Sequence, residues 1–192
     1  MTNLKIYLFR HGQSTFNRDG KFTGWMDARL TLKGKEQAKT IAKKLKNKKF
    51  QVAFRTSLSR SKETLKPVLK FHPECKKILV DDRMIERSYG IFEGTTHKDF
   101  IKKYGQKKYD LVHRGYNVKV PKGESFADVE KRVGSFIKWL KNYMIKNKIN
   151  VAISAHGNSI RLFRKIMENA TRDEATKWTI PYDKIFEYTL HD

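Results

Sequence analysis

The sequence predicts an α/β fold, a three-layer sandwich in which a mostly parallel central sheet is flanked by helices. Three observations predict it. Short apolar runs alternate with longer amphipathic segments, two of the apolar runs end abruptly in a His-Gly pair, and no Pro/Gly/Ser-rich linker divides the 192 residues. We therefore expect residues 1–192 to form a single domain whose reactive side chains gather at the carboxyl ends of its strands.

Three strands and two helices are expected in the first part of the chain. Leu4–Phe9, Phe50–Arg55 and Lys77–Val80 are apolar runs typical of buried strands. A helix begins after Thr31, a suitable N-cap, and a second helix occupies the segment 56–71. The apolar face of the first helix is expected to contain Leu32, Ala38, Ile41, Ala42 and Leu45.

Two irregular stretches separate these elements from one another and from the rest of the chain. Residues 10–30 form a loop long enough to indicate a functional role. Residues 84–124 are rich in glycine and contain short helical candidates at Lys98–Tyr104 and Lys107–His113. We interpret residues 84–124 as an insertion over the sheet edge and call it the lid.

The last part of the chain returns to the alternating pattern. Ser125 begins a strong helix and pairs with Asp128 in a capping pattern. A strand at Asn150–Ala155, a helix at Ile160–Met167 and an edge strand at Lys184–Leu190 are expected to follow. The apolar positions of the long helix step by three or four residues: Phe126, Val129, Val133, Ile137, Leu140 and Met144.

The composition limits the possible classes of function. The chain has 42 basic and 20 acidic residues, a net charge of +22, which attracts polyanions but is spread over lysines typical of a solvated surface. Cys75 is the only cysteine, which excludes an internal disulfide and a thiolate metal cluster. The apolar run Leu4–Phe9 is too short for a signal sequence or a membrane span, so we expect a cytoplasmic protein.

The chemistry is predicted where two strands end. The first strand is followed by Arg10, His11 and Gly12, and the later one by His156 and a second glycine. If these strands are neighbours in a parallel sheet, the two imidazoles meet Arg10 and Arg60 in one pocket that suits an anion, with phosphate the best match for arginine forks. A neutral imidazole there is also a nucleophile, so a covalent phosphoryl step is possible without a metal.

These residues resemble the histidine phosphatase superfamily and, within it, the cofactor-dependent phosphoglycerate mutases. The resemblance runs from Leu4 to about Arg161, with the RHG triplet and the later HGNS as its anchors. It implies that His11 is phosphorylated, that Arg10, Arg60 and His156 hold the phosphate, and that Glu86 is the proton donor. The implied fold is phosphoglycerate mutase-like.

Three further motifs favour a mutase over a plain phosphatase. FTGW and the following MD resemble the mutase loop, ERSYG resembles the mutase ERHYG, and the segment after RHG is mutase-like. The resemblance implies a priming cofactor, 2,3-bisphosphoglycerate, and a small phosphorylated substrate. A homodimer is possible, and neither a specific nucleic acid nor a membrane is expected as a partner. The implied substrate-binding residues are Gln13, Ser14, Asn17, Thr23, Gly24, Arg87, Tyr89, His97, His113, Arg114, Gly157 and Asn158.

The lid departs from the mutase pattern. His97 and His113 stand where typical mutases carry cations, and the stretch between Arg114 and Ser125 is shorter than in the bacterial mutases. Lys98 or Lys122 are candidates to supply the missing charge.

Three functions therefore stay open at this stage. We predict interconversion of 3-phosphoglycerate and 2-phosphoglycerate through phosphorylated His11. The alternatives are a broad-specificity phosphomonoesterase that uses water as the acceptor, and a polyanion-binding module without catalysis. The last is disfavoured because the chain keeps the residues that the chemistry requires and lacks a nucleic-acid-binding motif.

Overall fold

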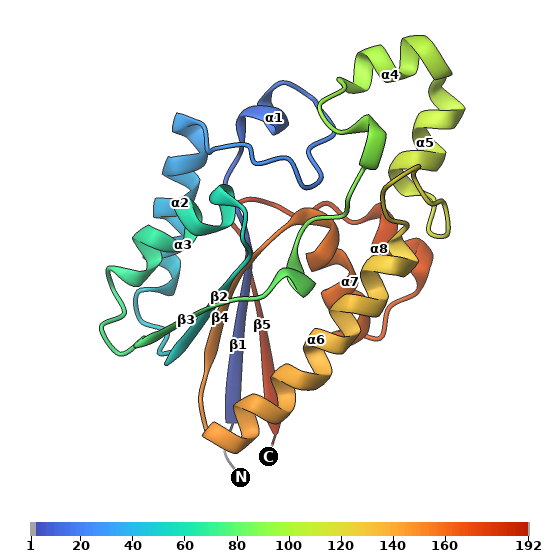
Figure 1. Ribbon diagram of the computed structural model, residues 1–192. Helices are drawn as coiled ribbons and strands as arrows, with labels where there is room; N and C mark the ends of the chain where they lie inside the picture. The colour runs from blue at the N-terminus through green and yellow to red at the C-terminus, as the bar shows by residue number, and fades with distance from the viewer. Residues whose placement is uncertain (1–2, 192) are drawn as a thin grey trace.

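The computed structural model describes residues 3–191 and confirms the α/β architecture (Figure 1). The sheet has the strand order β3-β2-β4-β1-β5. Strands β1 (Asn3–Arg10), β4 (Val151–Ala155), β2 (Val52–Arg55) and β3 (Lys77–Val80) are parallel, and β5 (Ile185–His191) runs antiparallel to β1 at the edge. The sheet is therefore mostly parallel, as the sequence predicts.

Helices cover both faces of this sheet (Figure 1). Helices α2 (Leu32–Leu45) and α3 (Ser59–Leu69) pack on one face, and α6 (Phe126–Asn147) and α7 (Gly157–Met167) on the other. The alternation along β1 divides its side chains between the two cores. Leu4, Ile6 and Leu8 join the larger core under α6 and α7, whereas Tyr7 and Phe9 join the core under α2 and α3.

The lid lies beyond the carboxyl edge of the sheet (Figure 1). The short helical turn η1 (Asp82–Met84) leads into the lid, which contains the turn η2 (Gly90–Phe92) and the helices α4 (His97–Tyr104) and α5 (Gln106–Arg114). A small hydrophobic cluster, separate from the two cores under the helices and completed by Phe22 from the loop after β1, holds it together, which is why a glycine-rich segment keeps a defined shape. The cluster is formed by Phe22, Tyr89, Phe92, Phe100, Val112 and Val120.

Several predicted boundaries differ from the structure. The short helices α1 (Thr15–Arg18) and α8 (Arg172–Lys177) were not predicted, although each begins with a capping box. Leu32 is 82% exposed, because as the first residue of α2 it points away from the sheet. Helix α7 begins at Gly157, three residues earlier than predicted, with His156 as its N-cap.

No helix within residues 3–191 combines the length and the apolar character that crossing a bilayer requires.

Candidate active site

The register of the sheet brings the two His-Gly pairs together. Arg10 is the register partner of Ala155 on the neighbouring strand, and the His11 amide donates to the Ala155 carbonyl at 3.0 Å. The residues that follow, His11 and His156, therefore emerge side by side, with ring centroids 5.0 Å apart. The third parallel strand ends next to them, since Thr56 lies 2.8 Å from His156 between Oγ1 and Nε2. The sheet therefore brings the two imidazoles together at its carboxyl edge, as predicted.

His11 is held in the geometry of a nucleophile. Its Nδ1 lies 2.7 Å from the Gly12 carbonyl, so Nδ1 carries the proton and Nε2 keeps its lone pair. Burial lowers the pKa of His11 well below its usual value, and the charges of Arg60 and Arg10 lower it further. Burial is the larger cause, and the imidazole is therefore neutral near pH 7.

Three buried side-chain nitrogens around His11 have no hydrogen-bond partner within residues 3–191. They are Arg10 Nε, Arg60 Nε and His156 Nδ1. Their remaining contacts hold them in place: Arg10 donates to the Ile180 carbonyl at 2.8 Å, and Arg60 donates to the carbonyls of Met26 and Gly24 at 2.9 and 2.8 Å. Buried donors are costly to leave unpaired, so this arrangement fits an anion with several oxygens.

Glu86 brings a carboxyl group to the same place. Its Oε1 accepts hydrogen bonds from the amides of Arg87 and Asn158 at 2.8 and 3.0 Å. Its Oε2 has no hydrogen-bond partner within the described part of the chain, although Glu86 lines the cavity beside Arg10. One oxygen is therefore fixed and the other is available to a bound molecule, as a proton donor requires.

A cavity of about 260 Å³ opens between Arg10, Glu86 and the lid, and the buried side chains of His11, Arg60 and His156 do not line it. Eleven of the predicted site residues line it, and they come from both sides of the sheet edge and from the lid. They are Arg10, Asn17, Thr23, Gly24, Glu86, Tyr89, His97, His113, Arg114, Gly157 and Asn158.

Three predicted substrate-binding residues lie outside the cavity wall. Gln13 is tied to the start of α2, where its side-chain and main-chain oxygens accept from Thr31. Ser14 is the N-cap of α1. Arg87 is fully buried and donates to the carbonyls of Glu124 and Val112, so it fastens the lid instead of facing the cavity.

The outer wall of the cavity contains two neutral imidazoles. His97 and His113 lie with ring centroids 5.5 Å apart, and both rings pack against Phe22 and Tyr109. Burial lowers the pKa of His97, and burial together with Arg114 lowers the pKa of His113 to about 3. Neither ring supplies the positive charge that stands at these positions in the mutase pattern.

The cavity obtains its additional charge from residues that sequence reasoning did not select. Arg161 and Lys21 line it, whereas the proposed substitutes Lys98 and Lys122 do not. Arg161 donates to the Asn158 side chain at 2.7 Å and to the Trp178 carbonyl at 2.8 Å, and burial lowers its pKa to about 9. Helical spacing could have identified Arg161. It lies three residues after Asn158, and therefore on the same face of a helix that begins at Gly157.

Two glycines shape the loops of the site. A Cβ at Gly12 would lie 2.2 Å from the Gly34 carbonyl oxygen, so Gly12 allows the loop to pack on α2. Gly24 has φ +51°, and a Cβ there would lie 2.0 Å from Glu93 Oε1. The same oxygen accepts from the amides of Trp25 and Tyr89, which joins the loop after β1 to the lid.

We expect the protein to lose stability as the pH falls below about 6.5, the ordinary pKa of histidine. Below that pH the unfolded chain binds a proton at His113, and the folded chain, with a His113 pKa of about 3, does not. The free energy of unfolding should therefore fall by about 1.4 kcal/mol per pH unit, or about 2 kcal/mol at about pH 5, from this residue alone. The lowered pKa values of His11, His97 and His156 act in the same direction.

Urea unfolding near pH 7.5 and near pH 5 measures this loss. His113→Phe keeps a ring against Phe22 and Tyr109 but cannot titrate, so it should lose about 2 kcal/mol less than the parent between the two conditions. An equal loss in both proteins would contradict the assignment of a neutral, buried His113.

Comparisons with known proteins agree with this geometry. Residues 6–192 match the family described as the histidine phosphatase superfamily (branch 1). A 2,3-bisphosphoglycerate-dependent phosphoglycerate mutase from Mesorhizobium japonicum is 34% identical over 176 residues, which cover 90% of this chain and 85% of that protein.

Two solved structures share the fold. The phosphoglycerate mutase of Bacillus anthracis superposes with a TM-score of 0.79 at 22% identity, covering 98% of this chain and 88% of the other. A mycobacterial glucosyl-3-phosphoglycerate phosphatase superposes with a TM-score of 0.76 at 19% identity, covering 98% and 96%. The fold therefore occurs in both a mutase and a phosphatase.

Proposed function

Since this chain belongs to the histidine phosphatase superfamily, we propose that it transfers a phosphoryl group through phosphorylated His11 and interconverts 3-phosphoglycerate and 2-phosphoglycerate. The observation that carries the proposal is a set of buried side-chain nitrogens around a neutral His11 that have no partner within residues 3–191: Arg10 Nε, Arg60 Nε and His156 Nδ1. These donors suit the oxygens of a phosphoryl group in transfer. The mutase relative supports the choice of substrate.

The proposed chemistry divides the reaction into two transfers. His11 Nε2 attacks phosphorus in line, the P–O bond of the ester breaks, and the Glu86 carboxyl gives its proton to the leaving oxygen. Arg10, Arg60 and His156 hold the phosphoryl oxygens as negative charge moves across them. In the reverse transfer the Glu86 carboxylate takes the proton from the acceptor hydroxyl, and the phosphoryl group leaves His11.

The rest of the cavity is assigned to the remainder of the substrate. Arg114 and Arg161 are cations of the outer wall, and we propose that they, with Thr23 and Gly24, receive the carboxylate. The primer 2,3-bisphosphoglycerate would enter the same cavity and leave one phosphoryl group on His11. No metal takes part in the proposed reaction. The cytoplasm stays the predicted location.

A phosphomonoesterase is the second candidate, and one observation favours it. His97 and His113 are neutral where the mutase pattern has cations, which weakens the hold on a doubly phosphorylated primer. Water would then accept the phosphoryl group from His11.

An assay that couples formation of 2-phosphoglycerate to a downstream enzyme separates the two candidates. We expect turnover of 3-phosphoglycerate to depend on added 2,3-bisphosphoglycerate and to release little inorganic phosphate. Turnover that ignores the primer, with phosphate released from several unrelated monoesters, would replace the mutase by the phosphatase. The third candidate, polyanion binding without catalysis, predicts salt-sensitive nucleic-acid binding that survives His11→Ala.

A further inference from the structure

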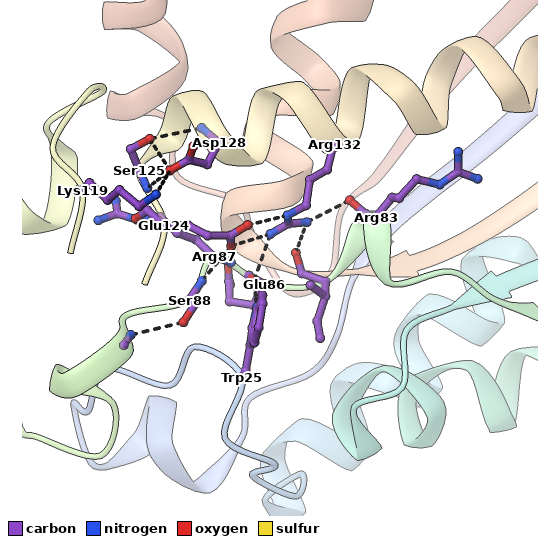
Figure 2. Close-up of polar contacts among 12 residues, drawn as sticks. Trp25, Arg83, Glu86, Arg87, Ser88, Lys119, Glu124, Ser125, Asp128 and Arg132 are labelled. Atoms are coloured by element: carbon purple, nitrogen blue, oxygen red, sulfur yellow. Dashed lines mark hydrogen bonds and ion pairs between the residues drawn. The ribbon is translucent and has the colours of Figure 1, made fainter. Parts of the chain in front are cut away.

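We propose that Arg132, which lies outside the cavity, is the positioning residue for the Glu86 carboxyl. The inference rests on the proposed function only in giving Glu86 the role of proton donor. Arg132 comes from α6, does not line the active-site cavity, and acts through the main chain that carries Glu86 (Figure 2).

Glu86 lies in a segment that has no regular secondary structure. Residues 85–89 connect η1 to η2, so no helix or strand fixes their carbonyl groups. Arg132 supplies the missing donors. Its Nη1 donates to the carbonyls of Arg83 and Ile85, both at 2.8 Å, and its Nη2 donates to the Glu86 carbonyl at 3.1 Å. One guanidinium therefore holds two carbonyls that precede the predicted proton donor and the carbonyl of the proton donor itself (Figure 2).

A second donor reaches the same carbonyl from the loop after β1. The Trp25 indole Nε1 donates to the Glu86 carbonyl at 2.7 Å. The Glu86 main chain is thus fixed between α6 and the FTGW segment, as Figure 2 shows. Trp25 is half exposed and does not line the cavity, so its contact with Glu86 can be removed with little effect on the core.

Glu124 aligns the guanidinium and extends the same arrangement. Its two carboxylate oxygens accept from Arg132 Nε and Nη2 at 2.8 and 2.9 Å, a bidentate pair, and Oε2 also accepts from the Ser88 amide at 3.0 Å. The two side chains are only 17% and 16% exposed. The Arg132–Glu124 pair therefore binds the main chain at Glu86 and at Ser88, and this leaves residues 86–88 little freedom to move.

The arrangement matters because Glu86 has one fixed and one available carboxyl oxygen. With the main chain in place, Oε1 meets the amides of Arg87 and Asn158, and Oε2 is left toward the cavity. A displacement of about 1 Å in a positioned catalytic group can cost about 10²-fold in rate. Removing the Arg132 contacts should therefore slow the steps that need a proton from Glu86, and only those.

The choice of leaving group tests this. An alkyl ester such as 2,3-bisphosphoglycerate releases an alkoxide that needs a proton, whereas p-nitrophenyl phosphate releases a phenolate that is stable without one. We would measure the single-turnover rate of His11 phosphorylation by each donor in Arg132→Lys, Arg132→Met and Trp25→Phe. Glu86→Gln gives the pattern expected for loss of the proton donor. Arg164→Lys is the control, because Arg164 is 15% exposed and ion-paired with Glu168 but lies outside the cavity.

We expect Arg132→Met to slow the alkyl donor by about 10²-fold and the aryl donor far less, as Glu86→Gln does. Arg132→Lys and Trp25→Phe should show the same selectivity at smaller size, and Arg164→Lys should show none. In Glu86→Gln, the Arg132→Met change should have little further effect on the alkyl donor. Equal slowing of both donors, or no slowing, would overturn the positioning role. If wild-type His11 accepts no phosphoryl group from either donor, the proposed function itself fails.

Discussion

Replacing His11 with asparagine is expected to abolish phosphoryl transfer, lowering turnover by roughly 10⁴–10⁶-fold, the range found when a member of a covalent catalytic unit is removed. Nε2 of His11 is the nucleophile of the proposed reaction, and the adjacent imidazole is not free to replace it. The neighbouring His156 has its Nε2 engaged with Thr56 at 2.8 Å. Steady-state turnover of 3-phosphoglycerate and of p-nitrophenyl phosphate measures the loss.

The chain offers a matched control in His72. His11 and His72 are both 2% exposed, but His11 contacts His156 at the sheet edge, whereas His72 packs on Phe50 in the core under α2 and α3. His72→Asn should therefore cost stability without the loss of turnover, measured on the fraction that remains folded. If His11→Asn kept substantial activity, phosphorylation of His11 could not be the central step.

Arg60→Lys is expected to lower turnover by about 10²–10³-fold, the scale of losing one preorganised oxyanion donor. The Arg60 guanidinium is fully buried, and burial lowers its pKa to about 10. It holds the carbonyls of Gly24 and Met26 while its Nε stays unpartnered within residues 3–191. A single ammonium cannot make these loop contacts and also present a donor to the phosphoryl oxygens.

The inhibition constant of inorganic phosphate is a second measure of the effect of Arg60→Lys. It should rise in Arg60→Lys, because the ground-state dianion uses the same donors. Arg55→Lys is the control, since Arg55 faces a separate surface hollow with Lys62 and Leu65. Unchanged turnover and phosphate inhibition in Arg60→Lys would contradict the assignment of Arg60 to the phosphate site.

The sequence was sufficient to predict the centre of the site. An apolar run that ends in Arg10 and His11, and another that ends in His156, specify two strand ends, and parallel pairing places such ends at one edge. The register partner of Arg10 is Ala155, so the two imidazoles could only emerge together once the strands were neighbours. Helical periodicity likewise predicted the two layers that cover the sheet.

The rest depended on contacts that no local pattern contains. Arg55 ends β2 as Arg10 ends β1, but only the fold shows that Arg55 faces away from the cavity. Arg87 belongs to the ERSYG motif, yet its guanidinium donates to the carbonyls of Glu124 and Val112, both more than twenty residues away in the chain. Arg161 was missed because the start of α7 was placed three residues too late. An error in the predicted start of this helix therefore left one residue of the cavity wall unidentified.

The most direct test of the account is to locate the phosphoryl group on the protein by mass spectrometry. The protein would be incubated with 2,3-bisphosphoglycerate, quenched under conditions that preserve phosphohistidine, and mapped by peptide. We predict one phosphoryl group, on His11, which persists until 3-phosphoglycerate is added and then leaves. A protein that stays unmodified, or that carries the group on His156, His97 or His113, would contradict the account.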